Sequence, residues 1–228
     1  MKAFLRLSAL GLAAILVACS GGSPKASVSP TPTNDAGRAR LLLLTQADLP
    51  AGWRASRHRS DPVSDREDKK LAACIGAPDP ARSASADVFG DVFGQGAQTI
   101  ASEVVFSRTT ADATKAVAAL KVRRVISCAT AAVRPVLAEQ LKLQGLSATI
   151  RSVSVKKRAL AVKGVVTAFR VAANLTASGA AITVQEDVVI LARGRAQVRA
   201  TFVDVGVAFP FGLELFVVKK LSGKLFHA

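Results

Sequence analysis

The hydrophobic residues change their spacing at Gly145, and this change limits the fold more than any other feature of the sequence. Beyond Gly145, apolar and polar residues alternate over 165–174, 182–190 and 196–202, which is the period of a half-buried strand. Short turns that contain glycine separate these segments, so neighbouring strands should run antiparallel. Together with residues 148–160 they predict four consecutive strands in a β-meander.

Before Gly145 the spacing is mostly helical. Apolar residues recur every three or four positions after Thr109, which predicts a long helix to about residue 132. Pro135 is expected to interrupt it before a shorter helix that ends near Leu143. The other expected elements are helices over 36–47, 64–74 and 210–221, a strand over 99–107, and an irregular stretch over 76–97 that holds four glycines.

These elements predict one α+β domain. We expect two layers, with helices packed on an antiparallel sheet of five or six strands that ends in the meander. The 228 residues are 50% hydrophobic, which is enough apolar surface to build a core and excludes a largely disordered chain.

The first nineteen residues predict export. Lys2 and Arg6 precede an apolar run over 7–18 that is too short to span a bilayer, so residues 1–18 are interpreted as a signal peptide. The run ends in Leu16-Val17-Ala18-Cys19, which resembles the bacterial lipobox. The resemblance implies a diacylglycerol thioether on Cys19 and an anchor at the outer face of the cytoplasmic membrane. The alternative is a secretory signal in which Cys19 lies at the cleavage site by chance.

Residues 19–37 are rich in Ser, Pro, Thr and Gly and should form an extended, flexible tether. The folded domain is then expected over 38–228. Its two cysteines, Cys74 and Cys128, form an even pair in an oxidising compartment, which favours a disulfide. Two free buried thiols are the alternative.

The charge is unevenly distributed along the chain. The formal net charge of the whole chain is +15. Residues 20–113 have a net charge of zero, and residues 114–228 have a net charge of +13. Aromatic residues are too scarce for a base-stacking nucleic-acid binder. Anionic lipid or wall polymer is therefore the expected partner of the basic half, and a generally basic, solvated surface is the equal alternative. The candidate contact residues are Arg123, Arg124, Lys156, Lys157, Arg158, Arg193, Arg195 and Arg199.

The sequence contains none of the common nucleophile, phosphate-loop or zinc motifs, so no catalytic residue, metal ligand or cofactor is predicted. Trp53, Glu186 and Arg170 are the candidates for a ligand cleft. Trp53 would be a platform or a core side chain. Glu186 would be a buried or cleft-lining carboxylate, or a charge balanced by Arg170 or Arg199. Glu186 and Asp187 should point to opposite faces of their strand and cannot form one dyad.

Several short motifs carry a resemblance to a known family. They are the lipobox, the Ser/Pro/Thr tether, the ADLP-x-GW element over 47–53, Cys74, the ASEV strand over 101–104, the helix that carries Cys128, and the β-meander. In this order they resemble actinobacterial secreted lipoproteins. These are similar to the extracellular sensor domain of PknH-type receptor kinases and to the LpqN-type (Mog1/PsbP-like) family.

The resemblance implies a non-enzymatic ligand-binding or sensor-like module at the cell envelope. A small lipophilic molecule is a further candidate partner. Two other classes of function stay open. One is an envelope hydrolase or transferase with an unrecognised site, and the other is an assembly factor that acts through the basic half.

Overall fold

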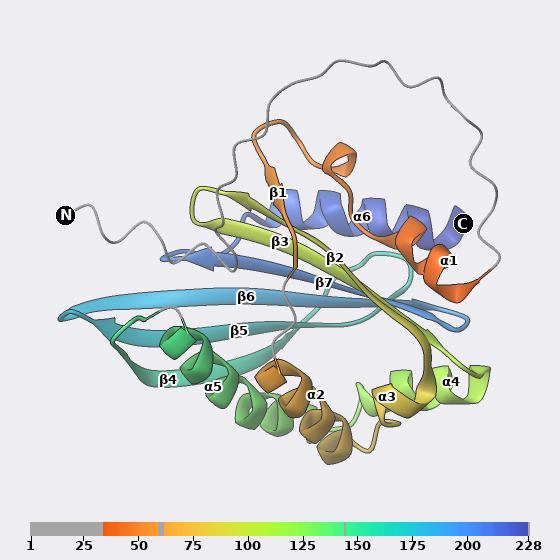
Figure 1. The fold of residues 1–228 in the computed structure, drawn as a ribbon, viewed down its shortest axis with the longest axis horizontal. Coiled ribbons are helices and arrows are strands. Elements are labelled where there is room, and N and C mark those ends of the chain that lie inside the picture. Colours follow the sequence, from red (N-terminus) through yellow and green to blue (C-terminus); the bar gives the residue numbers. More distant parts are fainter. Residues whose placement is uncertain (1–33, 59–61, 144, 228) are drawn as a thin grey trace.

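The computed structural model describes residues 34–58, 62–143 and 145–227. The predicted signal peptide over 1–18, Cys19 and most of the predicted tether lie outside these residues. Within them, seven strands form one antiparallel sheet in the order β1-β2-β3-β7-β6-β5-β4 (Figure 1). The strands are β1 Arg54–Ser56, β2 Ala84–Gln95, β3 Gln98–Ser107, β4 Ala148–Arg158, β5 Val165–Ala177, β6 Ala180–Arg193 and β7 Ala196–Val205.

The predicted meander is confirmed. Strands β4, β5, β6 and β7 pair in succession, each antiparallel to the next. The β5–β6 turn consists of Ser178 and Gly179, both with positive φ (49° and 80°), which matches the twist of the flanking strands in a tight hairpin. Strand β3 then pairs with β7, so the meander continues into the N-terminal strands.

The prediction of five or six strands is corrected to seven. Residues 76–97 are not irregular, because most of them form β2, and the short edge strand β1 pairs with it. Strand β2 was not predicted because glycines interrupt its sequence pattern. Gly90 lies where the pairing with β3 shifts register, and a Cβ at this position would come within 3.2 Å of the Ser102 backbone oxygen. Glycine here permits a close backbone approach inside a strand.

Helices cover both faces of the sheet, which corrects the two-layer expectation (Figure 1). On the first face, α1 and α6 pack over the strands in a core that includes Phe93, Ile100 and Phe202. On the second face, α2 and α5 pack over β4 and β5 around Phe169 and Val171. The helices are α1 Asp35–Leu42, α2 Pro62–Ile75, α3 Pro80–Ser83, α4 Thr110–Ala119, α5 Val125–Leu143 and α6 Phe211–His227, with a 3-10 turn η2 over Gln46–Asp48.

The long helix expected after Thr109 breaks earlier than predicted. It is divided into α4 and α5 by the turn residues 120–124, and α5 then continues through Pro135 to Leu143. Proline removes one backbone donor and crowds the preceding turn. Helix α5 nevertheless persists, and it packs on β4 and β5 through Val125 and Cys128. Tertiary packing of a helix face often outweighs such a local cost.

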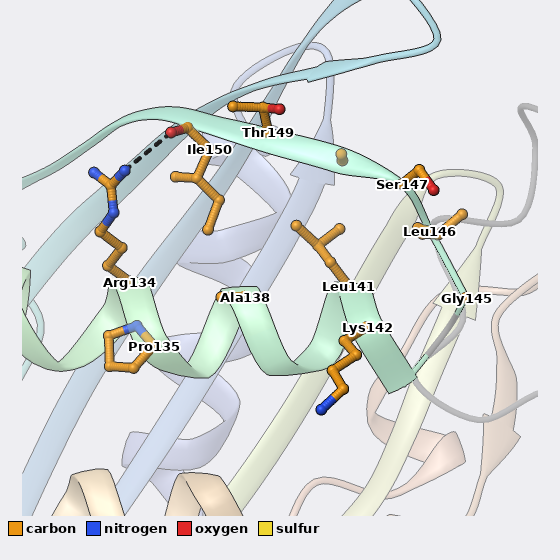
Figure 2. Close-up of a pocket in the computed structure, with 11 residues that line it drawn as sticks. Arg134, Pro135, Ala138, Leu141, Lys142, Gly145, Leu146, Ser147, Thr149 and Ile150 are labelled. Carbon is orange, nitrogen blue, oxygen red and sulfur yellow. Dashed lines mark hydrogen bonds between the residues drawn. The ribbon is translucent and has the colours of Figure 1, made fainter.

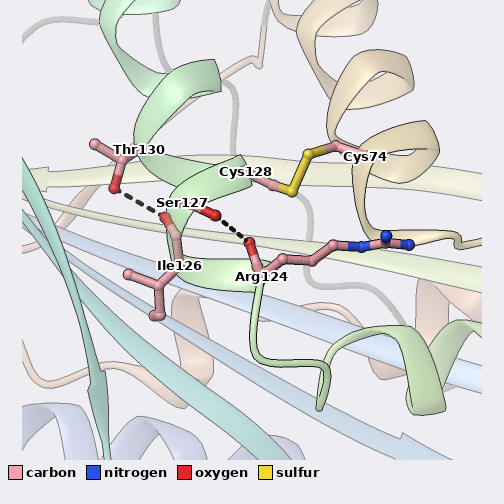
Figure 3. Close-up of a disulfide and its surroundings, with 6 residues drawn as sticks. All are labelled: Cys74, Arg124, Ile126, Ser127, Cys128 and Thr130. Carbon is pink, nitrogen blue, oxygen red and sulfur yellow. Dashed lines mark hydrogen bonds between the residues drawn. A yellow bond between two sulfur atoms is a disulfide. The ribbon is translucent and has the colours of Figure 1, made fainter.

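A disulfide joins Cys74 at the end of α2 to Cys128 in α5, as the sequence favoured (Figure 3). Cys128 is buried and faces the second-face core, as the helical spacing predicts. The bond fixes the two helices of this face to each other. None of the helices in the described residues is long and apolar enough to cross a membrane.

We predict that Cys74→Ser combined with Cys128→Ala lowers the free energy of unfolding by about 4 kcal/mol, because a closed loop of this length removes entropy from the unfolded chain. Urea unfolding of the parent and the double variant, both without reductant, measures the difference. An unchanged unfolding midpoint of the parent chain after full reduction would contradict the prediction.

Candidate functional site

Charged side chains gather on the second face of the sheet, over its central strands. We define the Arg199 cluster as Arg199, Glu103, Glu186, Asp87 and Asp68. Arg199 on β7 lies opposite Glu103 on β3, and its guanidinium contacts the Glu103 carboxylate at 2.5 Å. The same guanidinium lies 3.8 Å from Asp68 of α2. The Arg199 guanidinium therefore lies among four carboxyl groups.

The cluster holds protons more tightly than isolated carboxyl groups do. Burial raises the pKa of Glu103 to about 7, although Arg199 opposes the shift and Asp87 adds to it. Burial also raises the pKa values of Asp87 and Glu186. Burial disfavours the charged form of a carboxyl group, and a neighbouring carboxylate has the same effect. This part of the sheet therefore changes its charge close to neutral pH.

An aromatic pair lies near the same face. The ring of His58 stacks on Phe89 of β2, with their centroids 4.4 Å apart. Burial and the positive charge of Arg199 lower the pKa of His58. In the described residues, no group of three or more His, Cys, Asp or Glu side chains is arranged to hold a metal ion.

A second charged group lies on the opposite, first face. Arg158 of β4 donates to both carboxylate oxygens of Glu214 in α6 at 2.8 and 2.9 Å, and it lies 2.8 Å from Asp187 of β6. Arg170 of β5 donates twice to the same Asp187. These two cations and two anions form a balanced network that joins α6 to three strands, so its role is structural.

The structure does not bring the three candidate cleft residues together. Trp53 is 4% exposed and packs near Phe209 in the first-face core. Arg170 lies on the first face in the network with Asp187. Glu186 lies on the second face, where the charge of Arg199 acts on it. Glu186 and Asp187 thus point to opposite faces, as the strand pattern required.

The eight basic candidates divide into two groups. Arg158 and Arg199 belong to the ion pairs described above. Arg195 binds Asp35 at the start of α1, and Arg193 donates to the backbone oxygen of Leu225. These four arginines therefore have partners within the chain. The exposed candidates are Arg123 and Arg124 before α5, and Lys156 and Lys157 on the edge strand β4.

A cavity of about 820 Å³, largely open to solvent, lies between the C-terminal half of α5 and the first residues of β4 (Figure 2). The side chains of Leu141 and Ile150 point toward each other across it, and the Lys142 ammonium points away. Arg134 lies at one end and donates to the Ile150 backbone oxygen at 3.1 Å. The lining residues are Arg134, Pro135, Ala138, Leu141, Lys142, Gly145, Leu146, Ser147, Ala148, Thr149 and Ile150.

The sequence pattern did not indicate this cavity, and none of its residues belongs to the Arg199 cluster. Pro135 and Gly145 were the only signals there, and they were interpreted as a break and an end of helix. The cavity forms because α5 continues past Pro135 and lies beside β4. The arrangement depends on packing between the two elements and has no local sequence mark.

No protein-family model matches the chain, and a search of curated proteins finds no match. Among solved structures, the extracellular domain of PknH from Mycobacterium tuberculosis is similar at 11% identity with a TM-score of 0.44, covering 85% of this chain and 97% of that chain. LpqN, described as involved in cell envelope biogenesis of Mycobacterium tuberculosis, is similar at 11% identity with a TM-score of 0.27, covering 79% and 78%. Both proteins belong to the groups that the sequence motifs resemble.

We predict a pH dependence of stability that Glu103→Gln removes. The pKa of Glu103 in the folded state, about 7, lies above that of an unfolded glutamate, so the stabilisation from its bound proton is complete at low pH. This stabilisation is lost as the pH rises from about 4.5 to 7 and amounts to roughly 3 kcal/mol at most. Urea unfolding of parent and variant across this range measures it, and parallel pH profiles would contradict the prediction.

We also predict that Arg158→Ala destabilises the fold strongly. The substitution leaves Glu214 and Asp187 with one cation, Arg170. Glu214 is fully buried, and breaking a buried pair costs about 3–5 kcal/mol. The control is Lys157→Ala, which removes an exposed cation from the adjacent position and should change stability by no more than about 0.5 kcal/mol. Thermal unfolding of both variants compares them, and equal melting temperatures would disprove the structural role.

Proposed function

We propose that this chain is an exported, lipid-anchored and non-enzymatic binding module of the cell envelope. Its ligand would be a small lipophilic molecule that carries an anionic group. The cavity between α5 and β4 is the observation that carries the proposal. Its volume of about 820 Å³ lies within the range of about 300–1,000 Å³ that small-molecule sites occupy.

The lining supports this class of ligand. Leu141, Leu146 and Ile150 offer apolar surface for an acyl chain or another hydrocarbon group. Arg134 uses one N–H for the Ile150 backbone oxygen. A guanidinium has five N–H donors in a planar fork. Four of them make no hydrogen bond within the described residues, and they suit a carboxylate or a phosphate.

Two features support the proposed location. The disulfide between Cys74 and Cys128 belongs to a class of bond that persists in oxidising compartments outside the cytoplasm. The lipobox-like sequence over 16–19 supports an acyl anchor on Cys19, which lies outside the described residues. Anionic lipid or wall polymer remains the proposed partner of the exposed basic residues.

Binding of a fluorescent long-chain fatty acid tests the proposal, with its uncharged methyl ester as the comparison. We expect the parent chain to bind the acid more tightly than the ester. Ala138→Trp should weaken binding of both by filling the cavity, and Arg134→Gln should weaken binding of the acid alone. Arg151→Gln is the matched control, because Arg151 lies next to the cavity on β4, pairs with Thr176 and does not line the cavity.

The result that would overturn the binding proposal is equal affinity of the parent chain and both cavity variants for the fatty acid. Mass spectrometry of small molecules that co-purify with the chain is an independent measurement. A lipid recovered from the parent and absent from Ala138→Trp would support the cavity as its site.

One observation favours an envelope hydrolase as the second candidate function. Glu103 is 8% exposed, has a pKa of about 7 and interacts with Asp87. A carboxyl group with a pKa near the working pH is suited to general acid–base catalysis. Turnover of a co-purified ligand, lost in Glu103→Gln and retained in Arg134→Gln, would favour this function over simple binding.

A further inference from the structure

The outward side of α6 carries an exposed aromatic residue between lysines. Val217, Val218 and Leu221 face the sheet and are fully buried, whereas Phe216 on the opposite side is 42% exposed. Lys219 and Lys220 follow on the same outward side. The Lys220 ammonium lies 5.5 Å from the centroid of the Phe216 ring. Single exposed apolar side chains are common on protein surfaces, so Phe216 is informative only together with the apolar and basic residues beside it.

Helix α1 extends this surface. It lies beside the C-terminal part of α6 on the first face (Figure 1), and Lys224 of α6 holds it by donating to the Leu43 backbone oxygen at 2.7 Å. Leu41 of α1 is 56% exposed, and its neighbour Arg40 is exposed too. We define the α1/α6 surface as Arg40, Leu41, Phe216, Lys219 and Lys220.

No exposed carboxylate offsets these cations within the two helices. Each helix has one acidic residue, Asp35 in α1 and Glu214 in α6. Asp35 is bound by Arg195, and Glu214 is buried against Arg158. The outward charge of α1 and α6 is therefore positive, and it is interleaved with apolar side chains.

The segment between the proposed anchor and α1 is long enough for this surface to reach the membrane. Fifteen residues, 20–34, separate Cys19 from the first residue of α1. A chain of this length spans about 50 Å at most, which is comparable to the width of a domain of this size. Helix α1 is the first element of the described residues after the proposed anchor.

We propose that the α1/α6 surface docks on an anionic lipid bilayer. Phe216 and Leu41 enter the headgroup region, and Arg40, Lys219 and Lys220 bind lipid phosphates. Aromatic side chains favour the membrane interface, and basic side chains beside them add attraction to anionic lipid. The inference rests on the proposed location at the membrane and goes beyond it by assigning the contact to one face of the fold.

This orientation has a consequence for the other sites. The Arg199 cluster lies on the second face, below α2. The cavity lies between the edge strand β4 and α5, a helix of the same face. Docking through the first face leaves the second face, which carries both of them, directed toward the solution.

Tryptophan quenching by brominated lipid tests the proposal on the full-length chain reconstituted in anionic vesicles. Phe216→Trp places the reporter on the α1/α6 surface. Phe89→Trp is the matched control, because Phe89 is 40% exposed on the second face. The only native tryptophan, Trp53, is buried, and the parent chain gives its background. We expect several-fold greater quenching for Phe216→Trp than for Phe89→Trp.

Charge reversal tests the electrostatic part. Lys219→Glu with Lys220→Glu should remove most of the excess quenching of Phe216→Trp, and so should high salt. Arg123→Glu with Arg124→Glu makes the same change in charge before α5 and should leave the quenching unchanged. Loss of quenching in the Arg123/Arg124 variant alone would overturn the proposal. It would favour a membrane contact through the basic candidates of the sequence analysis, to which Arg123 and Arg124 belong.

The two proposals can fail separately. Suppose that the chain remains bound to both zwitterionic and anionic vesicles and that Phe216→Trp and Phe89→Trp are quenched equally. This result would support the anchor and overturn the docking surface. Dissociation from zwitterionic vesicles, with binding to anionic vesicles and quenching of Phe216→Trp, would contradict the anchor and support docking. A chain that leaves both kinds of vesicle would overturn both.

Discussion

The alternation of side chains along β6 determines where the charges of this protein lie. Asp187 points to the first face, where Arg158 and Arg170 bind it, and Glu186 points to the second face, toward Arg199. A slip of one residue in the pairing would exchange the two carboxylates and every apolar neighbour on the strand. The register of β6 with β5 and β7 therefore supports both the core under α6 and the Arg199 cluster.

The sequence allowed the meander to be predicted because its signals are local. Alternating residues define each strand, and turns such as Ser178-Gly179 fix its partner. Strand β2 escaped prediction because Gly90 and Gly94 lie inside it, and glycine usually marks a loop. The break between α4 and α5 and the persistence of α5 through Pro135 depend on packing, which a local pattern does not contain.

The candidate sites were harder to predict because their contacts join distant segments. Arg195 binds Asp35, 160 positions away, and Arg158 binds Glu214, 56 positions away. Counting charges along the chain places all of these arginines in one basic half. The fold pairs four of the eight candidates within the molecule. The other four candidates are exposed before α5 and on β4. The α1/α6 surface consists of different cations, and the exposed side chains of Phe216 and Leu41 distinguish it.

The disulfide links the second-face features to one another. Through Cys74 it fixes α2, which carries Asp68 to within 3.8 Å of Arg199. Through Cys128 it fixes α5, whose C-terminal half forms one wall of the cavity. On the first face, the buried network holds α6, and Lys224 attaches α1 to it. Each helical layer is thus fixed by its own strong links, so the proposed lipid contact and the proposed ligand site can act on opposite sides of one rigid sheet.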